Sequence, residues 1–290
     1  MILITGAAGF LGHHLLKQLE KEKIDYLFLV RKKNLKGRNV IYGDILEDNW
    51  QRDIKVPIDN IIHLAAVIDD GDKNLFKVNI KGTEKIVKLA EKLKVKNFIF
   101  LSSALVNFKD IETPYVKSKR EGEKIVLGSN LSWTILRPTQ TYGLGDKKNF
   151  GWILNFIKKN PVVPIFSGNL FLQPVYVDDV VKAITACLNN KSSERKIYNL
   201  GGPEILKLEE IEKLMIKKIK NPKIKIYFPH FLLKLLINVK DFLPPFLRKK
   251  LMILSKFEKV SFLEYKEAEK DLNFRPIKFK EGLSLWLKKY

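Results

Sequence analysis

The sequence has 290 residues, a formal net charge of +21 and 46% hydrophobic residues. This length suffices for one substantial core with a smaller appended lobe, and the apolar content excludes a disordered chain. We expect no nucleic-acid partner and no metal site, because neither zinc-finger spacing nor an aromatic stacking motif accompanies the charge. Three explanations of the charge stay open: a solvated lysine-rich surface, attraction to anionic phosphate ligands, and attraction to an anionic membrane surface.

The composition also bears on the compartment. Cys187 is the single cysteine, so it cannot form an internal disulfide. No run of about 18 uncharged apolar residues predicts a membrane span. The first apolar run opens at Met1, which leaves no room for a signal peptide. The sequence therefore predicts a cytoplasmic protein.

Short apolar strands alternate with amphipathic helices up to Leu200. This alternation predicts an α/β fold, a Rossmann-type doubly wound parallel sheet with helices on both faces. The predicted strands are Ile2–Thr5, Tyr26–Val30, Ile61–Leu64, Asn97–Leu101, Trp133–Leu136 and Lys196–Leu200. The predicted helices are Leu11–Glu22, Lys73–Lys94, Pro114–Leu127, Asn149–Lys159 and Asp178–Leu188.

The pattern changes after Gly201-Gly202-Pro203. A helix over Leu206–Lys220 and a strand over Ile224–Phe228 are followed by three or four helices, with Trp286 in the last. We predict a nucleotide-binding domain over residues 1–202 and a C-terminal α/β substrate lobe over residues 203–290. Parts of 143–175 are expected to contribute to the lobe.

The most informative motif lies between the first strand and the first helix, where Gly6, Gly9 and Gly12 are spaced three residues apart. In a strand-to-helix turn, the first glycine permits the tight turn and the second lets a pyrophosphate approach the backbone. The third lets the helix pack on the strand. The phosphates would bind at the helix N-terminus. A tight turn without a ligand is the alternative.

A second group of residues has side chains that could take part in a reaction. Tyr115 and Lys119 lie one turn apart on a predicted helix, so an ammonium would lie near the phenol and lower its pKa from about 10. Ser103 follows the strand that ends at Leu101 and could hydrogen-bond a reacting oxygen. We predict Ser103, Tyr115 and Lys119 as catalytic residues; a surface pair of tyrosine and lysine is the alternative.

In this order the motifs resemble the short-chain dehydrogenase/reductase superfamily, in its extended epimerase/dehydratase branch and its atypical branch. Further segments support the resemblance: Gly43-Asp44-Ile45, His63–Ala66, Val78-Asn79 with Gly82-Thr83, Leu136–Thr139 with Tyr142-Gly143, Pro174–Val180, and Asn273–Pro276 with Glu281–Leu283. The resemblance implies cofactor contacts at Gly6, Ala8, Gly9, Phe10, Leu11, Gly12, Arg31, Asp44, Ile45, Leu64, Ala65, Ala66, Asn79, Tyr115, Lys119, Pro138 and Thr139.

The residues after the second strand bear on which cofactor is used. An acid there would hold the ribose 2′-hydroxyl of NAD, but Arg31-Lys32-Lys33 follows Val30 instead. A cation in this position favours a 2′-phosphate, so we predict a preference for NADP(H), with NAD(H) as the alternative. Three solvated loop charges would explain the same residues without any role in binding.

The resemblance implies hydride transfer at a secondary alcohol or ketone, by an epimerase or a reductase, on a nucleotide- or lipid-linked sugar. Ala104-Leu105 replaces the Asp-Glu pair of 4,6-dehydratases, and Leu172 and Gln173 occupy the stretch where such epimerases carry an arginine for the diphosphate. The alternative is a non-catalytic NADPH-binding accessory protein of a membrane complex, resembling the accessory subunit of respiratory complex I. The basic apolar stretch Phe228–Val260 is expected to form core helices of the lobe or to contact an anionic membrane, and a homodimer is compatible with the family.

Overall fold

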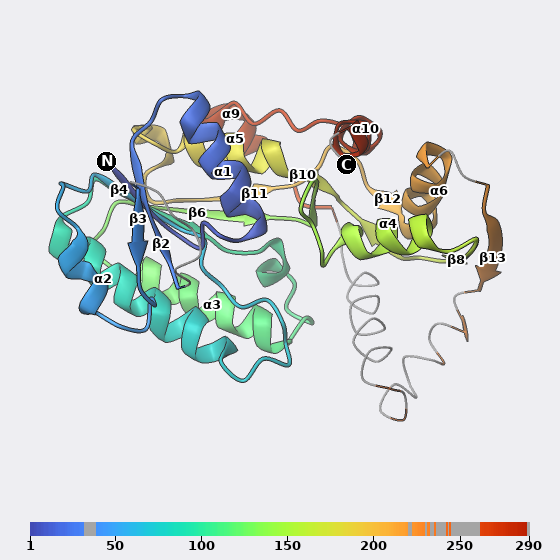
Figure 1. The fold of residues 1–290 in the computed structure, drawn as a ribbon, viewed down its shortest axis with the longest axis horizontal. Helices are drawn as coiled ribbons and strands as arrows, with labels where there is room; N and C mark the ends of the chain where they lie inside the picture. The colour runs from blue at the N-terminus through green and yellow to red at the C-terminus, as the bar shows by residue number, and fades with distance from the viewer. Residues whose placement is uncertain are drawn as a thin grey trace. The chain divides into compact units, whose positions relative to one another are not determined.

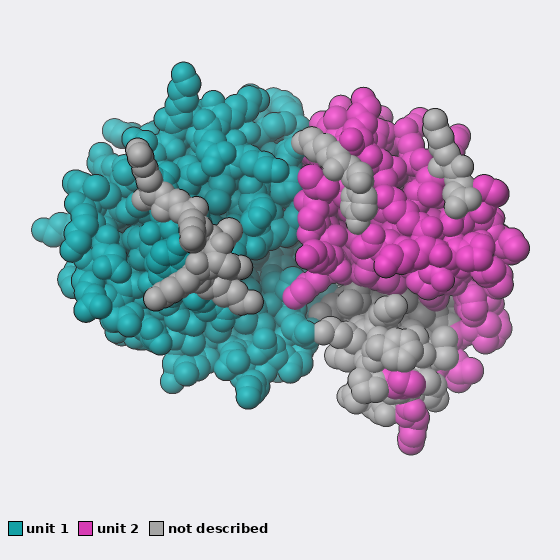
Figure 2. Space-filling model, in the orientation of Figure 1, with its two compact units in different colours: residues 1–138, 177–200, 264–275 teal, residues 139–176, 201–263, 276–290 magenta. Residues whose placement is uncertain are grey.

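The computed structural model describes residues 1–31, 39–219, 222–229, 231–232, 235, 242, 244 and 262–288. The chain divides into two compact units (Figure 2). Unit 1 comprises Met1–Pro138, Val177–Leu200 and Glu264–Arg275, and unit 2 comprises Thr139–Tyr176, Gly201–Leu263 and Pro276–Tyr290. The predicted domain limits at residues 202 and 203 remain a prediction.

Unit 1 is built on a seven-stranded parallel sheet with the order β11-β6-β5-β4-β1-β2-β3. The strands are β1 (Ile2–Thr5), β2 (Tyr26–Val30), β3 (Val40–Tyr42), β4 (Asn60–His63), β5 (Asn97–Leu101), β6 (Trp133–Pro138) and β11 (Lys196–Leu200). From β1 the strand order runs in one direction to β2 and β3, and from β4 it runs in the opposite direction to β5, β6 and β11. Doubly wound sheets bind their ligands at the position where the order reverses, here between β1 and β4. The predicted fold class is confirmed.

Helices cover both faces of this sheet (Figure 1). One face carries α1 (Phe10–Lys21) and α5 (Val177–Ala186), with α9 (Lys266–Leu272) packed beside α5. The other face carries α2 (Thr83–Leu93) and α3 (Pro114–Leu127). The π-helix η2 (Lys77–Gly82) leads into α2, and three short 3-10 helices are η1 (Asn49–Asp53), η3 (Ala104–Asn107) and η4 (Lys191–Ser193).

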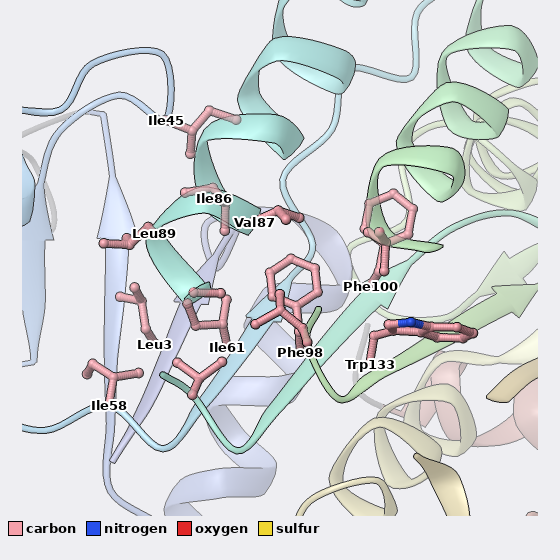
Figure 3. Close-up of a cluster of buried hydrophobic side chains, with 14 of the residues drawn as sticks. Leu3, Ile45, Ile58, Ile61, Ile86, Val87, Leu89, Phe98, Phe100 and Trp133 are labelled. Atoms are coloured by element: carbon pink, nitrogen blue, oxygen red, sulfur yellow. The ribbon is translucent and has the colours of Figure 1, made fainter. Parts of the chain in front are cut away.

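One hydrophobic core of unit 1 lies between the sheet and the helices α2 and α3 (Figure 3). Leu3, Ile61 and Phe98 enter it from three adjacent strands, and Ile86 and Leu89 meet them from α2. Both faces of the central strands are buried, which explains why they read as continuous apolar runs rather than as alternating ones.

Unit 2 contains three two-stranded sheets and three described helices. The strand pairs are β7 (Thr141–Tyr142) with β10 (Val175–Tyr176), β8 (Val162–Phe166) with β13 (Ile224–Phe228), and β9 (Phe171–Leu172) with β12 (Leu206–Lys207). The helices are α4 (Phe150–Lys159), α6 (Leu208–Lys218) and α10 (Phe279–Lys288).

Most predicted elements agree with the observed ones to within two residues. The strands β7, β8, β9, β10 and β12 of unit 2 were not predicted, and two further differences lie in unit 1. The helix predicted over Lys73–Lys94 begins at Lys77 and opens with a π-helical turn before α2. The three-residue strand β3 was not predicted, because so short an apolar run carries no periodicity. Lys32, Lys33 and most of the stretch Phe228–Val260 lie outside the described residues. Within the described ranges, no helix is both long enough and apolar enough to cross a membrane.

Candidate active site

In the turn after β1, Gly6 and Gly12 lie so close to other backbone atoms that neither position has room for a side chain. Gly6 has a φ of +77°, and a Cβ added to it would lie 2.5 Å from the amide nitrogen of Ala65. A Cβ added to Gly12 would lie 2.4 Å from the carbonyl oxygen of Ala7. Both glycines are therefore required by the packing of the chain itself.

The second glycine differs from the other two. A Cβ on Gly9 would meet only the carbonyl oxygen of Gly6, at 3.1 Å, and Gly9 is exposed. Gly9 is the N-cap of α1, whose N-terminus has no side-chain cap and no acidic residue in its first turn. Backbone N–H groups and the positive end of the helix dipole are therefore open to an anion, as a dinucleotide pyrophosphate requires. Ala8 is exposed beside Gly9, and Phe10 and Leu11 open the helix.

The turn after β3 is held by its own polar groups. Asp44 Oδ1 accepts a hydrogen bond from the Leu46 amide at 2.9 Å, and the indole of Trp50 donates to the Asp44 carbonyl at 2.9 Å. A Cβ on Gly82 would lie 2.5 Å from the Ile45 side chain, so this turn packs directly against η2. Arg31 is exposed and directly follows β2.

A buried histidine connects the glycine turn to η2. Thr83 Oγ1 donates to the Asn79 carbonyl at 2.7 Å, so it must accept from His63 Nε2 at 3.0 Å. Burial, reinforced by Lys119, lowers the pKa of His63 to about 3, so the ring is neutral and its Nδ1 carries no proton. Nδ1 therefore accepts from Thr5 Oγ1 at 2.6 Å. This chain of hydrogen bonds fixes the side chain of Thr5, which directly precedes Gly6.

The amide of Asn79 is fully used within the protein. Its Oδ1 accepts from the Val67 amide at 2.7 Å, and its Nδ2 donates to the Val67 carbonyl at 2.8 Å and to Ser118 Oγ at 2.9 Å. Asn79 thus holds the segment after β4, which contains the predicted cofactor residues Leu64, Ala65 and Ala66, against α3. Its predicted contact with the cofactor stays a prediction.

The three predicted catalytic residues lie together at the carboxyl end of β5. The side chain of Ser103 acts on the phenol of Tyr115 and lowers its pKa. Lys119, buried on the same helix as Tyr115, donates to the Leu101 carbonyl at 2.7 Å and lies 4.8 Å above the Phe100 ring. The helix spacing and the strand end therefore bring a hydroxyl, a phenol and an ammonium to one place.

The protonation of these groups corrects one expectation. The pKa of Tyr115 is raised to about 12, chiefly by burial and to a smaller extent by the charge of Asp70, against the lowering effect of the Ser103 side chain. The expected lowering by Lys119 is therefore wrong for this structure, because desolvation of the phenol is the dominant cause. Burial also lowers the pKa of Lys119 to about 8, against the opposing charge of Glu123.

Sequence reasoning missed the residues that hold the loop after Ser103. The guanidinium of Arg137 donates to both carboxylate oxygens of Glu123, at 2.8 and 2.5 Å, and to Asn107 Oδ1 at 2.7 Å. Asn107 in turn donates to the Ala104 carbonyl at 3.0 Å. No local pattern identifies this set, because β6, α3 and η3 meet only in the folded chain.

Two predicted cofactor residues lie where unit 1 gives way to unit 2. Pro138 is buried, and it is the last residue of β6 and of the first segment of unit 1. Thr139 is the first residue of unit 2, and its hydroxyl donates to the Gln173 carbonyl at 2.5 Å. Leu172 and Gln173 are fully buried, and the Gln173 amide donates to the carbonyls of Gly202 and Leu263. Over the described residues, no group of three or more His, Cys, Asp or Glu could hold a metal ion.

Comparisons with known proteins identify the family. The sequence profile of the NAD dependent epimerase/dehydratase family matches residues 2–201. The UDP-glucose 4-epimerase of Vibrio cholerae is 31% identical over 251 residues, which is 74% of this chain and 75% of that protein. The chloroplastic divinyl chlorophyllide a 8-vinyl-reductase of Arabidopsis thaliana is 23% identical over 84% of this chain, and the match spans 64% of the reductase.

The fold recurs in solved structures. The UDP-glucuronic acid 4-epimerase of Bacillus cereus, in complex with UDP-glucuronic acid and NAD, superposes with a TM-score of 0.78 at 21% identity. That superposition covers 99% of this chain and 98% of the epimerase. With the family profile spanning most of the sequence and the V. cholerae relative matching at 31% identity, the chain belongs to the NAD dependent epimerase/dehydratase family.

Proposed function

We propose that this protein is an NAD(P)-dependent epimerase or reductase that acts on a secondary alcohol or ketone of a sugar-like substrate. The observation that carries the proposal is the grouping of three side chains: Ser103 acts on the phenol of Tyr115, and the buried ammonium of Lys119 lies one helical turn from Tyr115 and donates to the Leu101 carbonyl. A merely structural nucleotide-binding protein needs no such set, which counts against the alternative of a non-catalytic accessory protein.

The residues have distinct roles in this proposal. NAD(P), when bound on the N-terminus of α1, supplies a hydride acceptor or donor. Tyr115 exchanges a proton with the substrate oxygen, and Ser103 orients that oxygen by hydrogen bonding. Lys119 has three N–H donors, and those that do not reach the Leu101 carbonyl can bind a ribose hydroxyl. The high pKa of Tyr115 makes it a proton donor at neutral pH, the form needed to reduce a carbonyl.

The substrate and the cofactor are narrower parts of the proposal. A relative named for UDP-glucose and a similar fold bound to UDP-glucuronic acid support a nucleotide-linked sugar, although Leu172 and Gln173 offer no cation for a diphosphate. The exposed guanidinium of Arg31 after β2 supports a preference for NADP(H) over NAD(H).

The test begins with the nucleotide released when the purified protein is denatured, followed by incubation with UDP-glucose and, separately, with a 4-keto UDP-sugar together with NADH or NADPH. Retained NAD(P)⁺ and formation of the C4 epimer would support an epimerase, whereas consumption of reduced nucleotide would support a reductase. Tyr115→Phe should abolish turnover and leave nucleotide binding intact. Tyr227→Phe makes the same chemical change at a side chain that is 54% exposed, and should have no effect. Failure to bind either nucleotide would contradict the proposal.

A further inference from the structure

The helix that carries Tyr115 is anchored from outside at its first turn. Thr113 is the N-cap of α3: its Oγ1 accepts from the Val116 amide at 3.4 Å, and its carbonyl accepts from the Lys117 amide at 2.9 Å. Pro114 has no N–H to satisfy. The Tyr115 amide is the remaining donor of this turn, and it donates to Asp70 Oδ1 at 2.8 Å.

Asp70 belongs to the acidic loop after β4 and lies 45 residues before Tyr115 in the chain. Its acidic neighbours satisfy amides of the loop itself: Asp69 Oδ1 accepts from the Gly71 amide at 3.2 Å, and Asp72 Oδ1 accepts from the Asn74 amide at 2.8 Å. Asp70 therefore differs from both, because its carboxylate reaches out of the loop to the backbone of Tyr115.

The same contact places a negative charge beside the phenol. The groups that act on the phenol from other elements are Ser103, before η3, and Asp70, in the loop after β4. On α3 itself, Lys119 lies one turn along the helix and donates to the Leu101 carbonyl. Lys117, between them, is exposed and ion-paired with Glu112 at 3.1 Å. Asp70 is thus the acidic group that opposes a phenolate at this position.

We propose that Asp70 is a positioning residue for the active site: its carboxylate accepts from the Tyr115 amide and so fixes the first turn of α3, and with it Tyr115, while its charge opposes ionisation of the phenol. This inference rests on the proposed function, in which Tyr115 transfers a proton. In this proposal the acidic loop after β4 affects the reaction through Tyr115, and Asp70 itself does not contact the substrate.

The test separates the charge from the hydrogen bond. The ionisation of Tyr115 is followed in the full chain by NMR of tyrosine labelled at the ring carbon that bears the hydroxyl, and its signal is assigned by its loss in Tyr115→Phe. Asp70→Asn and Asp70→Ala should each lower the pKa of Tyr115 by roughly half to one pH unit, as expected for removal of one charge at moderate effective dielectric. Asp72→Asn removes the same charge from the same loop and should leave that pKa unchanged.

Hydrogen exchange at the Tyr115 amide reports on positioning. Asp70→Asn keeps an oxygen acceptor and should retain protection, whereas Asp70→Ala should accelerate exchange about tenfold or more, the effect of losing one hydrogen bond to a charged group. Equal Tyr115 pKa values in Asp70→Asn and Asp72→Asn would overturn the charge role, and unchanged protection in Asp70→Ala would overturn the positioning role. Neither readout requires turnover, so an inactive wild type would refute the proposed function without deciding this inference.

Discussion

Substitution of Lys119 tests by how much a buried ammonium lowers the free energy of unfolding of this protein. Its side chain is 4% exposed, and burial lowers its pKa from 10.5 to about 8. At about 1.4 kcal/mol for each pKa unit, keeping this group charged at pH 7 destabilises the folded chain by about 3 kcal/mol. Lys119→Met removes that cost and preserves most of the side-chain volume.

The substitution also removes interactions that favour the folded state. The Leu101 carbonyl loses its 2.7 Å hydrogen bond with Lys119, at a cost of about 1–2 kcal/mol for a buried acceptor. The net expectation is therefore an apo protein that is more stable by about 1–2 kcal/mol at pH 7, yet inactive because the proposed site lacks its ammonium.

The pH dependence follows from the direction of the shift. Because the pKa of Lys119 is lower in the folded state than in the unfolded state, the unfolded chain holds an extra proton between about pH 8 and 10.5. The stability of the wild type therefore gains a favourable contribution as the pH rises through this window, and below pH 8 the full cost is present. Lys119→Met lacks this contribution, so its advantage should disappear by about pH 10.5.

Urea unfolding of nucleotide-free protein at pH 7 and pH 10 measures both effects. Lys117→Met is the matched control, because Lys117 lies on the same helix but is exposed and paired only with exposed Glu112. The control should change the unfolding free energy by less than about 0.5 kcal/mol. A variant Lys119→Met that is less stable than the wild type at pH 7, or one that retains the wild-type pH slope, would refute the reasoning.

Three further predictions concern the nucleotide site. Gly6→Ala forces a side chain into a left-handed backbone and to 2.5 Å from the Ala65 amide, so urea unfolding should show a loss of about 3 kcal/mol or more. In Gly9→Ala the new side chain meets only the Gly6 carbonyl, at 3.1 Å, so the unfolding free energy should change by less than about 1 kcal/mol. Calorimetric titration should show at least tenfold weaker nucleotide binding. Equal binding by the wild type and Gly9→Ala would argue against a pyrophosphate at α1. Arg31→Glu should weaken binding of NADPH more than binding of NADH in the same titration, and an equal effect on both would exclude a 2′-phosphate contact.

The part of the site that could be predicted from the sequence is the part that is local. Gly6, Gly9 and Gly12 are needed within one strand-to-helix turn, and the four-residue step from Tyr115 to Lys119 is one turn of one helix. Apart from the contact of Gly6 with Ala65, these constraints act between residues close together in the chain, so the sequence pattern shows them. The strands of unit 1 other than β3 were predictable because burial on both faces imposes a continuous apolar run.

Contacts between distant segments could not be predicted. The Asp70 carboxylate meets the Tyr115 amide across 45 residues, and the Arg137 guanidinium meets Glu123 across 14. Neither pair has a spacing that identifies it, because the sheet order alone brings these elements together. The direction of the Tyr115 pKa shift was predicted wrongly for the same reason. The pattern shows that Lys119 is one helical turn away, but only the folded structure shows that desolvation of the phenol is the largest cause.

These distant contacts explain how reactive groups can be held at the edge of the sheet. Ser103 lies at a strand end, where the regular backbone hydrogen bonds of the sheet stop, so its loop needs other anchors. Arg137 and Asn107 provide them on one side, through Glu123 and the Ala104 carbonyl, and Asp70 provides one on the other, through the first turn of α3. The two anchors therefore act on different atoms of the site. Removing the guanidinium of Arg137 should disturb Ser103 and, because Ser103 lowers the pKa of Tyr115, should raise that pKa, whereas removing the charge of Asp70 should lower it.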